Sequence, residues 1–253
     1  MTCFTPLKVF ELLSNLKVCE LLEAVENGEF SSLKENYPKS TLYYQIQRLK
    51  ELGFVEKRGE GYWITQTGNV CLKMMRKLHR CVENLNALLE HFPNHIISIP
   101  EELILRLDEL GKFEVVESKT TDILKPHRIV MDLILKAKNI KGVVPIFYPD
   151  YPSIFNKIID NVETLEIVVT EDVLRAVEIY ENVKDYSDRF HVYVIREHPL
   201  IAFTVTDYFF SAGFYRLSGD YDFWRVLVSK DKSAVSFGED LFRYYRNKSV
   251  RML

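Results

Sequence analysis

Side chains able to contact a polyanion gather between residues 39 and 58. Leu42, Ile46 and Leu49 recur with the spacing of one apolar helix face. The opposite face carries groups that donate, accept or stack, namely Lys39, Ser40, Tyr43, Tyr44, Gln47 and Arg48. Lys57 and Arg58 follow at a glycine-rich turn. Such groups read base edges and contact phosphates, so the pattern predicts a DNA-contacting surface. The alternative is a merely solvated face, which any amphipathic helix has.

A second set of polar residues follows the expected strands of the C-terminal half. These candidate ligand-binding residues are Tyr148, Thr170, Arg196, His198 and Asp207. They are grouped because ligands of open α/β sheets bind beyond the carboxyl ends of the strands. The helix expected to begin near Thr170 would favour an anion at its start. The acids that follow Thr170 favour simple capping instead. A structural role for each residue stays the alternative.

Catalytic motifs are absent from the sequence. There is no GxSxG elbow, no GxGxxG turn and no Walker loop. A His-x-Lys phosphodiesterase motif is absent too, because Tyr193 stands two residues after His191, and Leu200 two after His198. His127 is isolated as well. We therefore expect a protein that is not an enzyme and that needs no cofactor.

The cysteines indicate reduced, buried thiols rather than disulfides or a metal site. None of Cys3, Cys19, Cys71 and Cys81 forms a CxxC pair. If residues 71–81 form one helix, Cys71 and Cys81 lie about 15 Å apart, which is too far for a disulfide. Reduced thiols are typical of cytoplasmic proteins.

Composition places the chain among ordinary globular proteins. It has 253 residues, 47% hydrophobic and 27% charged, with a formal net charge of −3. That balance by itself indicates neither a nucleic acid nor a membrane partner. No apolar run reaches the roughly 18 residues of a membrane span. The start carries Lys8 and Glu11 and lacks a small-residue cleavage site, so we expect no signal peptide and a cytoplasmic location.

The first 65 residues show the order of elements of a winged helix-turn-helix. A helical stripe runs over 16–25 and ends at Asn27-Gly28, a short turn follows at 31–36, and a second helix spans 39–52. Two β-prone runs, 54–57 and 62–65, then form a hairpin. In this arrangement the second helix enters the major groove, and the hairpin lies beside it.

Residues 66–92 predict a long helix with a heptad pattern. The two positions of the pattern are filled by Cys71, Leu78, Leu85 and Phe92, and by Met74, Cys81 and Leu88. Such a stripe favours a homodimer through this linker helix, and packing on the chain's own domain is the alternative. Basic residues at 73, 76, 77 and 80 occupy another face, where they contact phosphate or water.

The C-terminal part, 93–253, alternates strands and helices. Strands are expected at 113–116, 142–147, 165–169, 190–195, 200–205, 209–217 and 223–228. Helices are expected at 101–110, 122–139, 153–162, 170–183 and 232–247. The fold class is α+β: a winged helix at 1–65, a linker helix at 66–92, and an α/β effector or dimerisation domain with a mixed sheet. The boundary is placed near Pro93–Pro100.

Two resemblances point the same way. Residues Pro38–Val55 resemble the recognition helix and first wing strand of arsenic-repressor-like regulators, although adjacent tyrosines replace residues that are usually small or basic. The segments 203–207, 211–215 and 236–246 resemble archaeal winged-helix regulators named after a methanogenesis regulatory protein. The resemblance implies a transcription regulator whose α/β domain senses an effector, without naming that effector.

The sequence therefore predicts a homodimeric transcription regulator that binds double-stranded DNA, without a metal or membrane partner. Two other classes stay open. An enzyme with an appended winged helix would show a convergent acid and base in a pocket of the second domain. A protein-interaction scaffold would show an acidic surface on the second helix.

Overall fold

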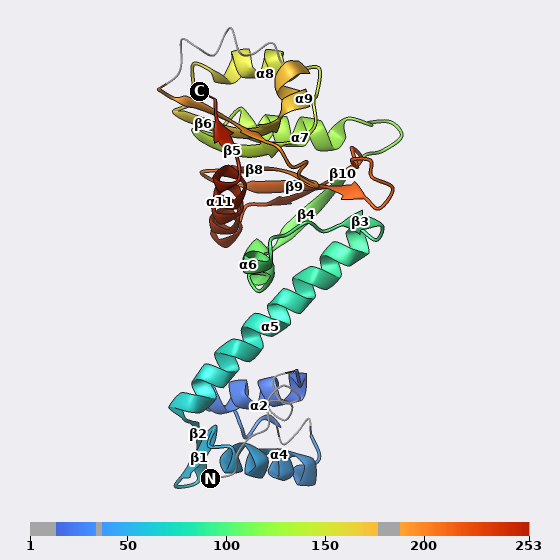
Figure 1. Ribbon diagram of the computed structural model, residues 1–253. Helices are drawn as coiled ribbons and strands as arrows, with labels where there is room; N and C mark the ends of the chain where they lie inside the picture. Colours follow the sequence, from blue (N-terminus) through green and yellow to red (C-terminus); the bar gives the residue numbers. More distant parts are fainter. Residues whose placement is uncertain (1–13, 34–36, 177–187, 253) are drawn as a thin grey trace. The chain divides into compact units, whose positions relative to one another are not determined.

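The computed structural model describes residues 14–33, 37–176 and 188–252. The chain divides into two compact units, Met1–Glu83 and Asn84–Leu253. The division falls inside the long helix α5 (Gln66–His91), and the proline-flanked stretch 93–100 lies in the second unit. Figure 1 labels the helices and strands of both units.

The first unit contains helices α2 (Leu16–Glu26) and α4 (Lys39–Glu51) and the antiparallel hairpin β1 (Val55–Arg58) and β2 (Gly61–Ile64). These elements confirm the predicted ranges to within one residue at each end. The expected turn at 31–36 lies partly outside the described residues. Asn15 caps α2 by accepting from the backbone N–H of Lys17 at 3.1 Å. Gly53, with φ +71°, follows α4 and turns the chain toward β1.

One apolar core holds the first unit together. It is formed by one face of each helix, by Val55 of β1 and by the start of α5, with Leu22, Ile46, Leu49, Leu72 and Met75 fully buried. Leu42, Ile46 and Leu49 of α4 are buried in this core, so the opposite face of α4 must point to solvent.

The second unit is an open mixed sheet. In the described residues its strand order is β11-β7-β6-β5-β8-β9-β10-β4, and β3 pairs with β9. The strands are β3 (His95–Ile96), β4 (Phe113–Glu117), β5 (Asn139–Val144), β6 (Thr164–Thr170), β7 (Phe190–Ile195), β8 (Ile201–Thr206), β9 (Phe210–Arg216), β10 (Arg225–Ser229) and β11 (Val250–Arg251). β5, β6 and β7 are parallel, and the other pairs are antiparallel. The predicted mixed sheet is confirmed.

Helices cover both faces of this sheet (Figure 1). One face carries α7 (Lys125–Ile134), α8 (Tyr151–Ile158) and α9 (Glu171–Ala176), and the other carries α11 (Lys232–Asn247). The short helix α6 (Glu101–Ile104) and the 3-10 helix η1 (Leu107–Leu110) precede β4. No helix of the described residues is long and apolar enough to cross a membrane.

Several element boundaries differ from the sequence-based expectation. The helix expected over 101–110 is instead two short elements, α6 and η1, and the helix expected over 153–162 is α8, which ends at Ile158. The helix expected over 122–139 is α7, which ends at Ile134, and the following strand begins at Asn139 instead of 142. The strand starts early because Asn139 and Ile140 already pair with Thr164 and Leu165 of β6. Pro145, which has no N–H for a sheet ladder, follows its last residue. The helix expected over 170–183 is described only as far as Ala176.

Candidate functional site

The predicted polar face of α4 points to solvent. Lys39, Ser40 and Gln47 are exposed, and the side chains of Tyr43 and Tyr44 are 47% and 66% exposed. Arg48 is half-buried at the flank. Two tyrosines this exposed on a helix are unusual, because each ring leaves a large apolar area in water. Contact with DNA through this face stays a prediction.

These side chains have few partners within the chain. In the described residues, Lys39, Tyr43 and Tyr44 make no side-chain hydrogen bond or ion pair, and Gln47 accepts only from Lys50 Nζ at 3.4 Å. Pro38 gives the start of α4 no side-chain cap, and the first turn contains no acid. The face is therefore free to bond an external group, and its amino-terminal end favours an anion.

The two basic residues at the hairpin tip have different environments. Lys57 is exposed and without an ion pair in the described part of the chain. Arg58 pairs with Glu56, and its guanidinium lies 6.0 Å from the ring of Trp63. Trp63, which was not among the predicted site residues, is 56% exposed. It lies opposite Glu56, on the side of the hairpin away from buried Val55, and the alternation of side chains along the strand could have predicted this exposure.

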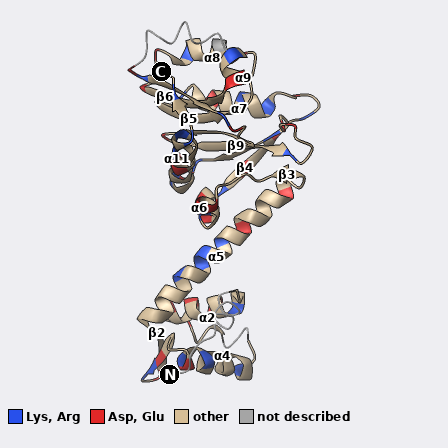
Figure 2. Cartoon of the chain, viewed as in Figure 1, with Lys and Arg blue, Asp and Glu red and all other residues tan. Residues whose placement is uncertain are grey.

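The basic run of α5 is not a uniform solvated face. Figure 2 shows Lys and Arg gathered along the middle of this helix. Arg76 binds Glu23 and Glu26 of α2, each at 2.8 Å. These bonds raise the pKa of Arg76 and fix α5 to α2. The sequence predicted that the basic residues of α5 contact either phosphate or water, and Arg76 does neither because it is bonded to α2. Lys73, in contrast, is exposed to solvent.

The heptad stripe of α5 divides into buried and exposed parts. Cys71 lies in the core of the first unit, and Leu88 and Phe92 are fully buried. For these positions, packing on the chain's own domain is confirmed. Met74 and Leu85 remain 55% and 37% exposed. Dimerisation through the middle of the helix stays a prediction. The described cysteines, Cys19, Cys71 and Cys81, are buried, as expected.

The structure separates the five candidate ligand-binding residues. Tyr148 lines a pocket above the sheet. His198 lies 2.8 Å from the hydroxyl of Tyr215, Arg196 is exposed, and Thr170 accepts from the N–H of Val173 at 3.3 Å. Thr170 thus has the capping role that was weighed against ligand binding. In the described residues no group of three or more His, Cys, Asp and Glu side chains could hold a metal.

The grouping of Asp207 with Tyr148 was wrong. β8 runs antiparallel to β5, so its carboxyl end lies beside the start of β5, at the edge opposite Tyr148. There Asp207 accepts from the backbone N–H groups of Lys138 and Asn139, at 3.0 and 3.2 Å. Partial burial favours a higher pKa for Asp207, but these bonds favour the carboxylate and lower it. Asp207 joins two chain segments.

A hollow forms where small residues meet across β5, β8 and β9. On the face below α7 and α8, Ala202 pairs with Gly213, and Thr204 pairs with both Ser211 and Gly142. The opposite face carries large side chains, Phe203, Phe210 and Phe214, and packs on α11. A Cβ at Gly213 would lie 2.0 Å from the hydroxyl of Tyr221, so only glycine admits this tyrosine.

Two adjoining cavities fill this hollow. The first measures about 150 Å³ and is lined by apolar side chains of β5 to β7 and α7 to α9, including Met131, Ile154 and Val144. The second measures about 70 Å³ and is lined by Thr204, Ser211 and several aromatic residues. Met131, Val144, Tyr151 and Thr204 border both cavities. The second unit thus holds an apolar chamber with a polar annex.

Aromatic rings line the annex. The rings of His127 and Tyr148 stack at 4.0 Å, and Phe223 lies edge-on to Tyr148 at 5.5 Å and to Tyr221 at 5.0 Å. Burial raises the pKa of Tyr148 to about 12, and it also raises the pKa values of Tyr151 and Tyr221 well above their usual range. These three hydroxyls therefore stay protonated at neutral pH and are available as donors.

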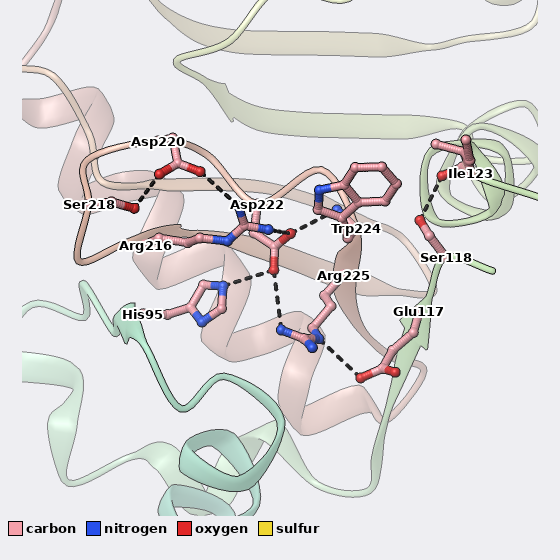
Figure 3. A network of polar contacts seen from close by, with 10 residues as sticks. All are labelled: His95, Glu117, Ser118, Ile123, Arg216, Ser218, Asp220, Asp222, Trp224 and Arg225. Atoms are coloured by element: carbon pink, nitrogen blue, oxygen red, sulfur yellow. Dashed lines mark hydrogen bonds and ion pairs between the residues drawn. The ribbon is translucent and has the colours of Figure 1, made fainter. Parts of the chain in front are cut away.

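A buried carboxylate stands beside this annex (Figure 3). Asp222 is fully buried; His95 Nε2 lies 2.9 Å from Oδ2, Arg216 donates at 2.8 Å, and Arg225 lies at 3.5 Å. The backbone N–H of Trp224 donates to the same carboxylate at 2.9 Å. Since a carboxylate only accepts, His95 must carry its proton on Nε2. The network joins β3, β9 and β10.

Comparison with known proteins finds similarity to a regulatory family over part of the chain. Residues 123–248 match the family model described as "Methanogenesis regulatory protein FilR1, middle domain". A curated protein, "Methanogenesis regulatory protein FilR1" from Methanothrix harundinacea (strain 6Ac), is 25% identical over 219 residues. The alignment covers 83% of this chain and 49% of that protein, so the chain spans about half the length of this relative. The match confirms the resemblance inferred from the C-terminal motifs.

Two solved structures show partial similarity. TrmBL2, described as an archaeal chromatin protein with a novel mode of DNA binding, is 18% identical with a TM-score of 0.44, covering 97% of this chain and 99% of that one. Phosphatidylserine synthase from Haemophilus influenzae Rd KW20 is 12% identical with a TM-score of 0.41, covering 62% and 48%. At these values neither similarity assigns a function to this chain.

Proposed function

We propose that this protein is a DNA-binding transcription regulator whose first unit is a winged helix and whose second unit senses a ligand. The observation that carries the proposal is the solvent face of α4, which presents Tyr43, Tyr44 and Gln47 beside the exposed Lys57 of the hairpin. Hydrogen-bonding and aromatic groups on a helix flanked by basic residues suit the major groove and its phosphates.

The order of elements supports this proposal. Helix α4 follows α2, its apolar side is fully used by the core, and the β1–β2 hairpin follows it directly. The match of residues 123–248 to a regulatory family supports a sensing role for the second unit. The proposal includes a cytoplasmic homodimer, since paired readers suit symmetric operators, and binding of the effector without turnover.

Titration of a selected operator tests the proposal by separating base contacts from phosphate contacts. Tyr44→Ala with Gln47→Ala should reduce discrimination between operator and random DNA by about 1–3 kcal/mol per lost base contact. Lys57→Ala should weaken binding to all sequences alike and reduce the slope of log K against log salt by about 0.9. Lys17→Ala removes the same charge from an exposed site on α2 and is the matched control.

Arg58→Ala should have a smaller effect than Lys57→Ala, because Glu56 already neutralises Arg58. If the double variant discriminates as well as the parent, α4 does not read bases. If Lys57→Ala and Lys17→Ala change the salt slope equally, the hairpin does not contact the backbone. A protein that selects no sequence from a random pool would refute the regulator proposal.

A further inference from the structure

We propose that the paired cavities of the second unit bind a small neutral amphipathic molecule, with an apolar part of about six carbon atoms and a head that accepts hydrogen bonds. The apolar part occupies the chamber lined by Met131 and Ile154, and the head lies in the annex at Thr204 and Ser211. The proposal deepens the sensing role included in the proposed function, and rests on it for its regulatory meaning.

The size of the ligand follows from the cavity volumes. A dry apolar cavity of about 150 Å³ accepts a benzene-sized molecule, and the chamber has that volume. The annex of about 70 Å³ equals the liquid volume of roughly two water molecules. It therefore accommodates a head of two or three heavy atoms.

The head must form hydrogen bonds because the annex holds hydroxyls without partners. Ser211 is 2% exposed, and its hydroxyl makes no hydrogen bond within the described residues. Thr204, Tyr151 and Tyr221 are half-buried, and their hydroxyls make no hydrogen bond in that part of the chain either. Polar groups that line a cavity are normally bonded to protein or to ordered water, and a ligand that replaces such water must take over its hydrogen bonds. The two tyrosines donate, since their raised pKa values keep them protonated, so the matching head group is an acceptor such as an amide carbonyl.

The head is neutral because the charges at the annex are already paired. Arg225 lies 3.1 Å from Glu117 and 3.5 Å from Asp222, and His127 lies 2.8 Å from Asp150. A carboxylate or ammonium head would be buried without a free counter-charge, which is costly. The aromatic rings would favour a cationic head by cation–π attraction, so a cationic probe is the decisive competitor.

Calorimetric titration of the full chain, without DNA, tests the proposal with straight-chain amides from butanamide to octanamide. Affinity should rise about fourfold for each methylene group up to the length that fills the chamber, near hexanamide, and then fall. Hexanoate and hexanamidinium, which share the pentyl chain and the three-heavy-atom planar head of hexanamide, should bind at least about tenfold more weakly than hexanamide. Tighter binding of either charged probe would overturn the neutral head, and failure of every amide to saturate the protein would overturn the site.

Substitutions in the annex and in the chamber test where the head and the apolar part of the ligand bind. Thr204→Val and Ser211→Ala should each weaken hexanamide about fivefold. Tyr208→Phe is the matched control, since its hydroxyl donates to the carbonyl of Leu133 outside the annex. Val144→Phe should abolish binding by filling the chamber. If that variant fails to fold, Thr204→Val decides the matter, because it keeps the side-chain shape, and parent-like binding by it would refute the assigned head position.

The amide titrations and the DNA titrations test the two proposals independently. An operator-binding protein that ignores every amide refutes this inference and leaves DNA reading intact. A protein that binds hexanamide and no DNA retains the pocket and loses the regulator proposal.

Discussion

Loss of the buried carboxylate of Asp222 should destabilise the second unit strongly. Asp222 is fully buried and bonds His95, Arg216 and the backbone N–H of Trp224, with Arg225 nearby (Figure 3). Arg216 and Arg225 are about one-third exposed, and in Asp222→Ala they keep Asp220 and Glu117 as partners. The main cost is therefore the loss of the acceptor for His95 and for the backbone N–H of Trp224, at about 1–3 kcal/mol each. For a unit of this size each kcal/mol lowers the melting temperature by roughly 2–4 °C, so the expected decrease is about 4–24 °C.

Differential scanning calorimetry of the full chain measures this decrease, and Asp220 provides the control. Asp220 lies two residues away and binds the same Arg216 at 2.8 Å, but its side chain is 54% exposed. Asp220→Asn should therefore leave the melting temperature close to that of the parent, because solvent-exposed ion pairs contribute little. Equal decreases for Asp222→Ala and Asp220→Asn would refute the reasoning that burial sets the strength of this network.

Three further predictions follow from other contacts. Leu85→Glu, which places a charge in the exposed stripe of α5, should halve the particle mass in light scattering if the helix forms the dimer, whereas Asn86→Glu on another face should not. Asp207, whose pKa is lowered in the fold, contributes stability that is present above its unfolded pKa of about 3.9 and is lost as pH falls through the folded value. Asp207→Asn should thus reduce the stability difference between neutral and acidic urea melts. His95→Gln should retain hexanamide binding but abolish any effect of hexanamide on operator affinity.

The first unit could be predicted from sequence because its signals are local. The spacing of Leu42, Ile46 and Leu49 defines both the buried and the exposed face of α4, and a glycine ends the helix. Nothing beyond helix geometry was needed to place Tyr44 on the surface. Partners were not predictable in this way: the pairing of Arg76 with two acids of α2 depends on how the helices pack.

Strand direction was the information that the sequence lacked in the second unit. Asp207 follows a strand, as Tyr148 does, and the rule for open sheets grouped them. The rule holds only for parallel strands, and β8 is antiparallel to β5. The two-residue strands β3 and β11 were missed because they are too short to show a period.

The pocket was missed for a related reason. Ala202, Thr204, Ser211 and Gly213 are individually unremarkable small residues in two strands. Only the register, which sets Ala202 opposite Gly213 and Thr204 opposite Ser211, gathers them on one face. Alternate small residues in two consecutive strands joined by a short turn were a usable signal, since a hairpin register follows from its turn.

The segment 221–225 gives the proposed sensor a physical route to the long helix. Tyr221 and Phe223 line the annex, while Asp222 between them bonds His95, which lies four residues after the end of α5. The ring of Phe92, at the same end of α5, packs edge-on against His95 at 5.2 Å and Phe214 at 5.0 Å. A ligand that moves the ring of Tyr221 must therefore move or strain a buried carboxylate bonded to the residues after α5.

By linkage, any shift in DNA affinity caused by the ligand must equal the shift in ligand affinity caused by DNA. Hexanamide titrations with and without operator would thus have to agree with operator titrations with and without hexanamide.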